Sequence, residues 1–523
     1  MILTMKKRIF EYPTILMLMF LCLSSSASAA GFDLAQTENL FPYREFEHEI
    51  GFWEQVFAKY ESNQVLLHDD RDLRLIYYVK EFETGIDSND REARRQKKVL
   101  EQEIRNLKRD LEVIHSLGPD SPGLNQRQKD IAARTEALGY GTDASTIYGL
   151  KQRLRYQRGI SDKFRQSLVR SGRYLETMKE IFRSYGLPED LAYLPHVESS
   201  FDYNAYSKAG AAGVWQFTRG TGRSFLRISG SVDERLDPIK ATDAAARLLK
   251  ENFSILETWA LTMTSYNYGR NGMLRAKKKF GTDFRKIVDN HESRYFGFAS
   301  RNFYAEFLTA MKVAKNYHDY FGELVLEKPL AFKTLRLDRS YDAGYFTSVP
   351  GFTLEVLGDH NPHIRRVLSR SLKVIPAGVD LRIPMDKYEA VMASLESAGP
   401  SSARLIAASD GSLRYKVQPG DSLGLIAGAM ETSVSYLQRL NGIRNPNRIY
   451  PGQVLLIAPA DSSASYRGIS GDSAESVYVV RHGDNLTGIA RKFRVSVKEL
   501  QTRNDISNPN RIHPGMKLEI PAS

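Results

Sequence analysis

The chain has 523 residues, of which 42% are hydrophobic and 26% charged, so it can bury more than one sizeable core and is not a disordered protein. Its formal net charge of +11 favours anionic polymers, and envelope glycans, nucleic acids and membrane surfaces all qualify. The single cysteine, Cys22, lies within the first 29 residues, so the rest of the chain can hold neither a disulfide nor a cysteine-ligated metal.

Residues 1–29 have the pattern of a cleaved secretory signal. A basic patch at residues 6–8 precedes an apolar run at 15–23, and small residues follow up to position 29. The alternative is an uncleaved anchor, but this apolar run spans only about 13 Å as a helix, against the ~30 Å core of a bilayer. We therefore expect an exported protein that is peripheral to the envelope, in the periplasm or associated with the cell wall.

Residues 30–165 are expected to form an N-terminal helical region. A turn at 118–123 separates two helical stretches, and three heptads are few for an oligomeric coiled coil, so we favour a helical hairpin packed on its own domain. The sequence leaves the oligomeric state open. The heptad pattern rests on five apolar residues in a highly charged stretch: Leu100, Ile104, Leu107, Leu111 and Ile114.

The run His-Asp-Asp at residues 68–70 is the one place that suggests metal ligands. The sequence offers no second histidine nearby and no HExxH motif anywhere. We expect no metal site and no cofactor.

Glu198 is the candidate catalytic acid of the region 166–330. It lies on a helix that Pro188 begins. Leu191, Leu194 and Glu198 stand at positions i, i+3 and i+7 of that helix, so the three side chains share one face. A carboxyl group on an apolar face loses solvation when charged, so its pKa should rise, as a general acid near neutral pH requires. The alternative is a glutamate at a helix end that turns out to water.

Three later segments are rich in the aromatic and amide residues that bind sugar rings. They are "SKAGAAGVWQF" at 207–217, "TSYNYG" at 264–269 and "RNFYAEF" at 301–307. Each is weak evidence alone, because tyrosine and phenylalanine are usually core residues.

The acids close in sequence to these segments have other expected roles. We expect Asp202 to cap a turn, and Glu234 and Asp237 to form a structural ion pair around Arg235. The sequence therefore predicts one catalytic carboxylate rather than two.

The C-terminus carries an internal repeat. Residues 415–457 realign without gaps on residues 478–520, including a Gly-Asp pair, an Asn-Pro-Asn-Arg-Ile run, a Pro-Gly pair, and Asn441 on Asn504. Each copy has the β-α-α-β pattern, and Ser/Gly/Ala-rich linkers precede them at 394–413 and 460–476. The copies, bounded at 414–459 and 477–523, resemble LysM modules, which bind N-acetylglucosamine-containing glycans; compact spacers are the alternative.

A weaker third copy is suggested at residues 331–393. It contains "PGFTLEVLGDHNP" and "IPAGVDLRIP", which give a helix followed by asparagine and a Pro-x-Gly before a strand. The opening Gly-Asp is missing, so we interpret it as a degenerate LysM-like or packing segment. Whether it binds glycan is left open.

The order of the motifs in 198–304 resembles the lytic murein transglycosylases related to goose-type lysozyme, and with LysM modules behind them it is most similar to the membrane-bound D type. The resemblance covers residues 174–318 and 415–521, and this chain departs from it at Trp215 and Ser265. It implies a mainly α, lysozyme-like (α+β) catalytic domain with Glu198 as sole acid. It also implies glycan contacts at Ser207, Gln216, Phe217, Tyr266 and Asn267, and a hydrogen bond to the acid from Tyr304.

The expected function is cleavage of the β-1,4 bond between N-acetylmuramic acid and N-acetylglucosamine, closing a 1,6-anhydro ring without water. Peptidoglycan glycan strands are the expected partner. Two other classes remain, a goose-type lysozyme hydrolase on the same fold and a non-catalytic peptidoglycan-binding protein. Nucleic-acid binding is disfavoured, because the positive charge is dispersed and the chain begins with a secretory pattern.

Overall fold

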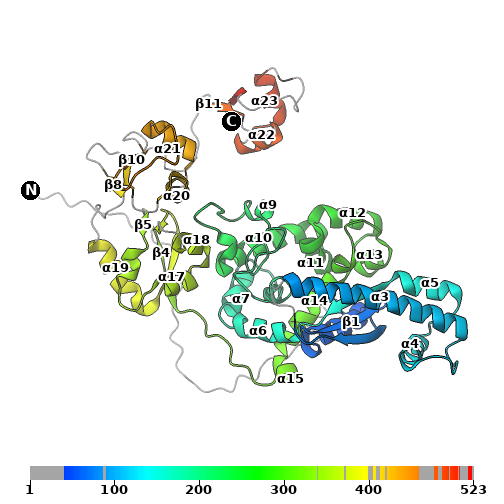
Figure 1. Cartoon of the computed structure of the whole chain (residues 1–523). Helices are drawn as coiled ribbons and strands as arrows, with labels where there is room; N and C mark the ends of the chain where they lie inside the picture. The colour runs from blue at the N-terminus through cyan, green and yellow to red at the C-terminus, as the bar shows by residue number, and fades with distance from the viewer. Residues whose placement is uncertain are drawn as a thin grey trace, which may run out of the picture. The chain divides into compact units, whose positions relative to one another are not determined.

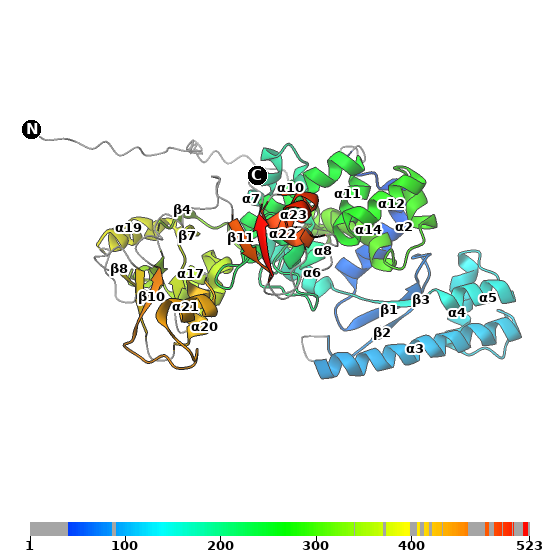
Figure 2. The same ribbon diagram turned by 90° about the horizontal axis from the view of Figure 1, so that it is seen from above.

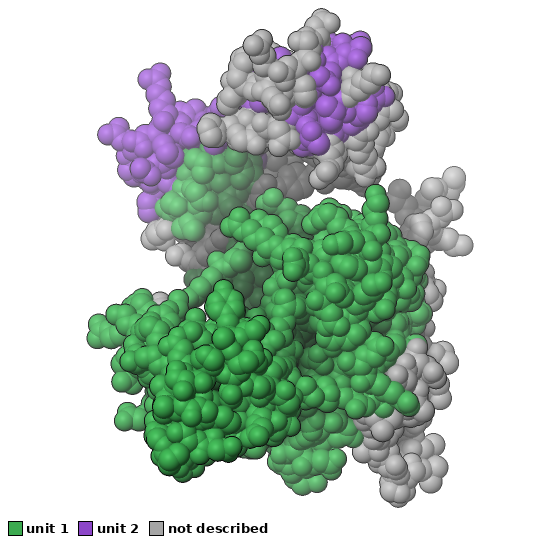
Figure 3. All heavy atoms as spheres, turned by 90° about the vertical axis from the view of Figure 1, so that its right-hand side faces the viewer, with its two compact units in different colours: residues 1–399, 420–434 green, residues 400–419, 435–523 purple. Residues whose placement is uncertain are grey.

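The computed structural model divides into two compact units (Figures 1 and 3), one formed by Met1–Gly399 with Gly420–Val434 and the other by Pro400–Pro419 with Ser435–Ser523. The predicted signal, and most of both predicted linkers, lie outside the described residues. Within the described part of the chain, no helix is both long and apolar enough to cross a bilayer. The described residues are 40–85, 90–338, 340–369, 373–397, 405–407, 413–417, 421–430, 432–458, 476–480, 486–493, 495–504, 506 and 516–520.

The N-terminal region contains the predicted helices and, in addition, a small antiparallel sheet that the sequence did not indicate. The strand order is β2-β1-β3, and Leu66 on the central strand pairs with Val79 on one side and Gln157 on the other. The elements are α2 (Glu47–Glu54), η2 (Gln55–Lys59), β1 (Gln64–Asp69), β2 (Ile76–Glu81), α3 (Asp90–Leu117), α4 (Gln126–Ala137), α5 (Ala144–Gln152) and β3 (Leu154–Arg158).

The predicted helical hairpin is present. The heptad residues Leu107 and Leu111 of α3 are at most 1% exposed and share a hydrophobic cluster with Ile131 of α4 and Leu150 of α5. Helix α3 runs alongside α4 and α5 (Figure 2). The apolar face of α3 is therefore covered by its own chain, as the prediction of a self-packed hairpin requires.

The region after β3 is a helical domain built around α14. Its capping is regular: Asp237 accepts hydrogen bonds from the backbone of Ile239 and Lys240 at the start of α10, where Pro238 occupies the first turn. The elements are α6 (Ser161–Ser171), α7 (Leu175–Ser184), η3 (Glu189–Tyr193), α8 (Pro195–Glu198), α9 (Arg219–Gly222), η4 (Glu234–Leu236), α10 (Pro238–Leu256), α11 (Trp259–Tyr268), α12 (Arg270–Phe280), α13 (Phe284–Asn290), α14 (Phe298–Lys315) and α15 (Tyr317–Phe321).

The N-terminal residues complete the core of this helical domain. Phe41 is fully buried against Phe307 and Trp259, and the indole of Trp53 donates a hydrogen bond to Asn302 on α14 at 3.4 Å. One hydrophobic cluster includes residues from 41 to 314. The predicted boundary between residues 165 and 166 falls inside α6, so no separation of domains exists there.

Residues 332–397 form a further small fold with its own apolar cluster. Strands β4 and β7 pair antiparallel, with Thr334 opposite Arg382, and α16 and α17 lie between them in the chain, which gives a β-α-α-β order. The elements are β4 (Phe332–Arg336), β5 (Tyr341–Asp342), α16 (Gly344–Thr347), α17 (Leu354–His360), η5 (Pro362–Ile364), α18 (Arg365–Leu368), β6 (Val374–Ile375), β7 (Asp380–Pro384), η6 (Met385–Lys387) and α19 (Tyr388–Ser397).

The tandem copies have the predicted β-α-α-β order, and the first gains an added strand, β8, beside β9. The two Gly-Asp pairs each include residues outside the described part, as does the Asn-Pro-Asn-Arg-Ile run of the second copy. The elements are β8 (Leu405–Ala407), β9 (Leu413–Lys416), α20 (Leu423–Ala429), α21 (Val434–Asn441), β10 (Val454–Ala458), β11 (Ser476–Val479), α22 (Leu486–Phe493), α23 (Val497–Arg503) and β12 (Lys517–Ile520).

All three β-α-α-β folds share one side-chain arrangement, which we call the asparagine clamp. An asparagine at the end of the second helix, Asn361, Asn441 or Asn504, donates from its amide to a carbonyl of its own helix and to a carbonyl of the last strand. Its side-chain oxygen accepts from the backbone N–H of that same strand residue. The repeated asparagine therefore fixes the second helix to the last strand, which makes it a structural residue.

Candidate active site

Glu198 is the last residue of the four-residue helix α8, and the chain turns sharply behind it. Ser200 and Phe201 follow with φ of 52° and 55°, in the left-handed region that side chains with a Cβ rarely adopt. The guanidinium of Arg170 donates to the carbonyl of Ser200, and the Ser199 hydroxyl donates to the carbonyl of Val214 at 3.0 Å. These contacts set the position from which the carboxyl group of Glu198 projects.

The carboxyl group of Glu198 is half-buried, and burial raises its pKa to about 8. Within the described part of the chain it has no hydrogen bond or ion pair. A neutral carboxyl group that can donate a proton at neutral pH is therefore present. The single helix predicted for Leu191, Leu194 and Glu198 is not: Leu191 lies in η3, Leu194 precedes α8, and Glu198 ends α8. The alternative of a glutamate in open water does not agree with this burial.

Tyr266 on α11 is a titratable side chain whose pKa is affected by the charge of Glu198. Burial, and next the charge of Glu198, raise the pKa of Tyr266 well above its ordinary value, so its hydroxyl stays protonated. That hydroxyl donates to the carbonyl of Trp215 at 2.7 Å, and its ring meets the edge of Phe217. Tyr266 thus joins the segment 207–217 to the helix α11 beside the acid.

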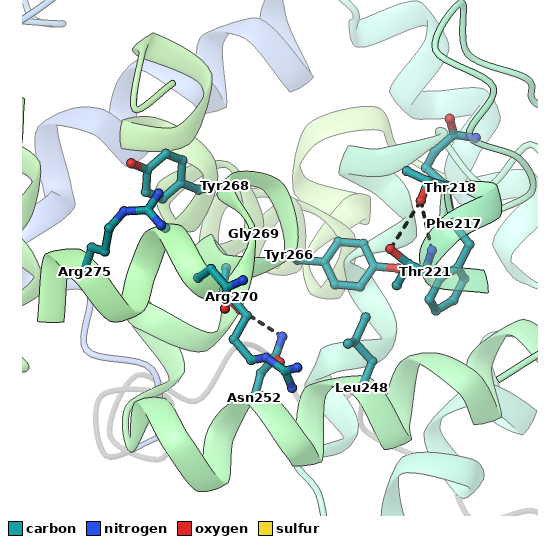
Figure 4. Close-up of a pocket in the computed structure, with 14 residues that line it drawn as sticks. Phe217, Thr218, Thr221, Leu248, Asn252, Tyr266, Tyr268, Gly269, Arg270 and Arg275 are labelled. Carbon is teal, nitrogen blue, oxygen red and sulfur yellow. Dashed lines mark hydrogen bonds between the residues drawn. The ribbon is translucent and has the colours of Figure 1, made fainter. Parts of the chain in front are cut away.

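A cavity of about 460 Å³ opens along Gln216, Phe217 and Tyr266 (Figure 4). Polar groups line much of it: Arg270 lies beside Asn252, and Arg275 lies beside Tyr268 at the side away from Phe217. Its other lining residues are Thr218, Thr221, Leu248, Ser265, Gly269, Asn271 and Gly272. A cavity of this size, with aromatic, amide and cationic groups, fits part of an anionic sugar chain.

The loop before this cavity depends on small residues. Gly213 has φ of 76°, and a Cβ there would lie 1.8 Å from the carbonyl oxygen of Arg235. Gln216 also lies in the left-handed region, with φ of 45°, and its amide donates to the Gly213 carbonyl at 2.8 Å. The glycine is therefore required by close backbone approach, and the amide of Gln216 is oriented by the loop that it follows.

The other predicted glycan residues are less directly placed. Asn267 is exposed, and its side-chain oxygen accepts from the Ser300 hydroxyl at 2.8 Å. Ser207 is exposed, and its hydroxyl oxygen accepts from the Ala211 backbone within its own turn. The fully buried Trp215 donates to Thr242 and belongs to the core. Of the predicted residues, the cavity brings together Gln216, Phe217 and Tyr266.

Tyr304 does not follow the prediction. Its hydroxyl donates to the carbonyl of Pro42 at 3.0 Å instead of to Glu198, and its fully buried ring lies edge-on to Phe46 and Phe284. Its proton is thereby used to hold the N-terminal segment against α14.

The predicted ion pair around Arg235 was also wrong in its partners. Arg235 pairs with the buried Asp233, whereas Glu234 pairs with Lys240. Asp237 caps α10 and pairs with Arg382. The turn role expected for Asp202 is present: its side chain accepts from the backbone of Asn204 at 2.8 Å. None of these acids is left for catalysis.

A second carboxyl group, which the sequence reasoning missed, lies near the acid. Glu306 on α14 is half-buried, and burial, followed by the charge of Glu198, raises its pKa to about 8 against the opposing effect of Arg155. The signal was available, because Glu306 lies one turn after Asn302 and Phe303 and is flanked by the apolar residues Ala305 and Phe307, which are buried. Glu306 is far from Glu198 in the sequence, whereas the prediction of one catalytic carboxylate rests on the acids close to Glu198, so it stays a prediction.

Residues 177–287 match the family model of the transglycosylase SLT domain, and residues 415–458 and 478–521 match that of the LysM domain. The chain contains an SLT transglycosylase domain and two LysM domains. The SLT match includes Glu198 and the cavity, whereas Tyr304 and Glu306 lie beyond it. The mainly α, lysozyme-like fold class with C-terminal LysM modules is confirmed.

Similar proteins include a transglycosylase and an amidase. Membrane-bound lytic murein transglycosylase D of Escherichia coli (strain K12) is 27% identical over 364 residues, which are 67% of this chain and 77% of the relative. N-acetylmuramoyl-L-alanine amidase sle1 of Staphylococcus aureus (strain USA300) is 37% identical over 125 residues, 23% of this chain and 37% of its own. A solved structure of an inactive mutant of lytic transglycosylase Slt from Pseudomonas aeruginosa has 14% identity and a TM-score of 0.19, covering 45% of this chain and 36% of that chain.

Proposed function

We propose that this protein is a peptidoglycan lytic transglycosylase that uses Glu198 as its catalytic acid. It cleaves the β-1,4 bond between N-acetylmuramic acid and N-acetylglucosamine and leaves 1,6-anhydromuramic acid ends. The observation that carries the proposal is the half-buried, neutral carboxyl group of Glu198, which lies beside Tyr266 within an SLT domain and has no hydrogen-bond or ion-pair partner among the described residues.

The chemistry needs one proton, which leaves Glu198 and returns to it. Glu198 protonates the bridging oxygen, the bond from that oxygen to muramyl C1 breaks, and the N-acetyl group of muramic acid stabilises the developing oxocarbenium ion. The carboxylate then accepts the proton of the C6 hydroxyl while that oxygen bonds to C1. Attack within one sugar is favoured by effective molarities of about 10⁵ M or more, and the burial of Glu198 favours its return to the neutral form.

The cavity supports a carbohydrate chain with carboxylate substituents. Gln216, Tyr266 and the edge of Phe217 provide an amide, a hydroxyl-bearing ring and an apolar ring. The guanidinium groups of Arg270 and Arg275 suit the carboxylates carried by the lactyl and peptide groups of muramic acid. Ser207, on the loop before the cavity, and Asn267, at the end of α11, are further proposed contacts to the glycan chain.

The modules and the N-terminal pattern support the proposed location in the cell. In this proposal the two LysM domains bind the glycan strands of peptidoglycan, residues 1–29 act as the export signal, and the enzyme works in the periplasm or cell envelope as a peripheral protein. The described region 332–397 is a third, LysM-like fold. No cofactor takes part in the proposed reaction.

The test is the product formed from purified sacculi. Wild-type enzyme should release fragments with anhydromuramic ends, each lighter by one water molecule than its hydrolytic counterpart. Glu198→Gln should bind sacculi with unchanged affinity and release no fragments, because glutamine keeps the shape and cannot donate the acid proton. Digestion by this variant at near the wild-type rate would mean that another residue is the acid.

The second carboxyl group gives one rival function a specific basis. Two carboxyl groups at one bond are the usual equipment of a hydrolytic glycosidase, in which the second activates water, and Glu306 is available for that role. A majority of reducing muramyl ends in the same digest would identify the protein as a lysozyme-like hydrolase.

A further inference from the structure

The segment 199–217, which we call the cavity loop, joins the acid to the sugar cavity. It begins directly after Glu198 and ends with Gln216 and Phe217, which line the cavity. The loop consists of turns and isolated bridges, with no helix or ladder of its own to fix it. The positions of its two cavity residues therefore depend on what the loop contacts.

Two arginines of helix α18, in the LysM-like fold, contact the cavity loop. Arg365 donates a hydrogen bond to the side-chain oxygen of Asn204, and its guanidinium carbon lies 5.7 Å from the ring centre of Tyr203. Arg366 donates to the hydroxyl of Tyr206 at 3.2 Å, with its guanidinium carbon 5.6 Å from the centre of that ring. Since a guanidinium is attracted to an aromatic face, each arginine holds the loop by a hydrogen bond and a ring contact.

A second connection runs through the backbone of the LysM-like fold. The carbonyl of His363 accepts from the N–H of Asp233 at 2.9 Å, and the Asp233 carboxylate accepts two hydrogen bonds, of 2.8 and 2.9 Å, from Arg235. The Arg235 guanidinium also donates to the carbonyls of Gly210 and Phe217, at 2.8 and 3.0 Å. Hydrogen bonds therefore link the LysM-like fold to a residue that lines the cavity.

The two tyrosine rings of the loop differ in how much else holds them. The hydroxyl of Tyr203 also accepts from Arg173 of the catalytic domain at 3.2 Å, and Tyr174 packs edge-on to the ring. Tyr206 is 49% exposed, and Arg366 supplies the hydrogen bond to its hydroxyl. The loop around Tyr206 therefore depends more on the LysM-like fold than the loop around Tyr203 does.

The two arginines are anchored in their own fold but stay in contact with solvent. Arg365 pairs with Asp359 at 2.7 Å, and its side chain is 32% exposed, while that of Arg366 is 38% exposed. Polar contacts at such exposure contribute little to folding stability. We therefore expect these contacts to affect the geometry of the loop more than the stability of the protein.

We propose that the LysM-like fold at 332–384 positions the cavity loop for the glycan, with Arg365 and Arg366 as positioning residues that act through Gln216 and Phe217. The inference rests on the proposed function, which assigns these two cavity residues to sugar binding. A loop that is ordered before the substrate arrives binds it more tightly, because binding need not order the loop. The degenerate repeat thereby serves the reaction from outside the SLT match.

The effect should appear in KM more than in kcat, because separate contacts from Arg170 and Val214 hold the chain next to the acid. Kinetics of the full-length protein on soluble glycan chains measure this. Arg366→Ala should raise KM about ten-fold and keep kcat within about three-fold of wild type, and Arg365→Ala should raise KM by less. Arg366→Lys should restore part of the binding, because an ammonium group also reaches a hydroxyl and a ring face.

Trypsin measures the order of the loop without any substrate, because Lys208 is exposed within it. Cleavage after Lys208, followed by mass spectrometry, should be faster in Arg366→Ala than in wild type. Lys333→Ala is the matched control, since it removes a cation of the same fold that pairs with Glu389 at the surface. It should change neither KM nor this cleavage, and the urea midpoint of tryptophan fluorescence should be the same in all variants.

Each result decides the proposal. KM and cleavage after Lys208 both unchanged in Arg366→Ala overturn it, and so does a lower urea midpoint with KM unchanged, which would make the arginine structural. If Arg366→Ala does not fold, Tyr206→Phe decides, because it removes the same hydrogen bond and should also raise KM. Activity retained by Glu198→Gln would instead reject the proposed function, and the trypsin result would still report on the loop.

Discussion

The fold at 332–384 and the second LysM domain at 476–520 both pair their first and last strands antiparallel and share the asparagine clamp, yet their last strands carry different side chains. The strand residue held by the clamp is Arg382 in the first and Glu519 in the second. In the first LysM domain it is Leu456. The backbone geometry is therefore kept while the side chain at this one place varies.

The side chain at this place makes different contacts in the two folds. Arg382 is 4% exposed and makes two hydrogen bonds to Asp237 at the start of α10, where His363 lies 3.0 Å from the same carboxylate. Although burial opposes it, Arg382 and His363 hold the pKa of Asp237 well below its usual range. Glu519, in contrast, makes an ion pair with Arg503 at the surface of its own module. A shared fold is thus joined to the catalytic domain by a buried ion pair, together with further contacts such as the ion pair of Lys240 with Asp380.

The most damaging test of this comparison replaces Arg382 with the residue of the first LysM domain. Arg382→Leu removes the cation from the buried Asp237 carboxylate and leaves it with His363 and the backbone N–H groups of α10, so it should lower the free energy of unfolding by about 3–5 kcal/mol. Urea denaturation followed by tryptophan fluorescence measures this, because the three tryptophans, Trp53, Trp215 and Trp259, all lie in the catalytic unit. Glu519→Leu is the control, expected within about 0.5 kcal/mol of wild type. A loss below about 1 kcal/mol for Arg382→Leu would contradict a structural role for the pair.

Substituting the clamp asparagines tests two points. The first is whether each fold loses stability without its asparagine, and the second is whether that loss reaches the catalytic unit. Asn361→Ala removes three hydrogen bonds, each worth about 1 kcal/mol, so it should lower the free energy of unfolding reported by the tryptophans by about 2–3 kcal/mol. Asn504→Ala should disrupt the second LysM domain, leave the tryptophan transition unchanged, and reduce binding to sacculi. A shift of the tryptophan transition by Asn504→Ala would mean that the second LysM domain is coupled to the catalytic unit.

Truncation compares glycan binding by the three folds. A chain ending at Ala398 keeps the fold at 332–384 and loses both LysM domains, and its affinity for sacculi should fall by about 100-fold. A chain ending at residue 459 should lose less, since one module remains, and both truncated chains should still cut short soluble glycans. If the chain ending at Ala398 binds sacculi as tightly as the full-length chain, the LysM domains are spacers and binding resides elsewhere.

Local patterns predicted the parts of the molecule that are determined locally. The repeat gave both LysM domains with their strand and helix order, and the apolar residues Leu191 and Leu194 before Glu198 indicated the burial and raised pKa of the acid. The heptad run gave the hairpin of α3 and α4. Each of these depends on residues within a few turns of one another.

The errors concern contacts between distant segments. Glu306 is 108 positions after Glu198 and meets it only because α14 packs on α8. The Tyr304 hydroxyl finds Pro42, 262 residues away, which no neighbouring pattern indicates. In the sequence, β1 and β3 are separated by the long helical hairpin of α3 and α4. Because most of this stretch is charged and helical, the sequence pattern did not indicate that the two strands pair in a sheet whose central strand is buried.

Because the N-terminal segment completes the core of the catalytic domain, the enzyme can become active only after that segment has met its partners on α14. Phe41, Pro42 and Trp53 are made early, yet their partners on α14 lie about 250 residues later in the chain. At a synthesis rate of about 5–20 residues per second, they wait on the order of ten seconds or longer for those partners to exist. Contacts of such long range also slow folding. A cleft that can cut the cell wall is therefore assembled only after the whole catalytic region has been synthesised, which gives a newly made chain a period of latency.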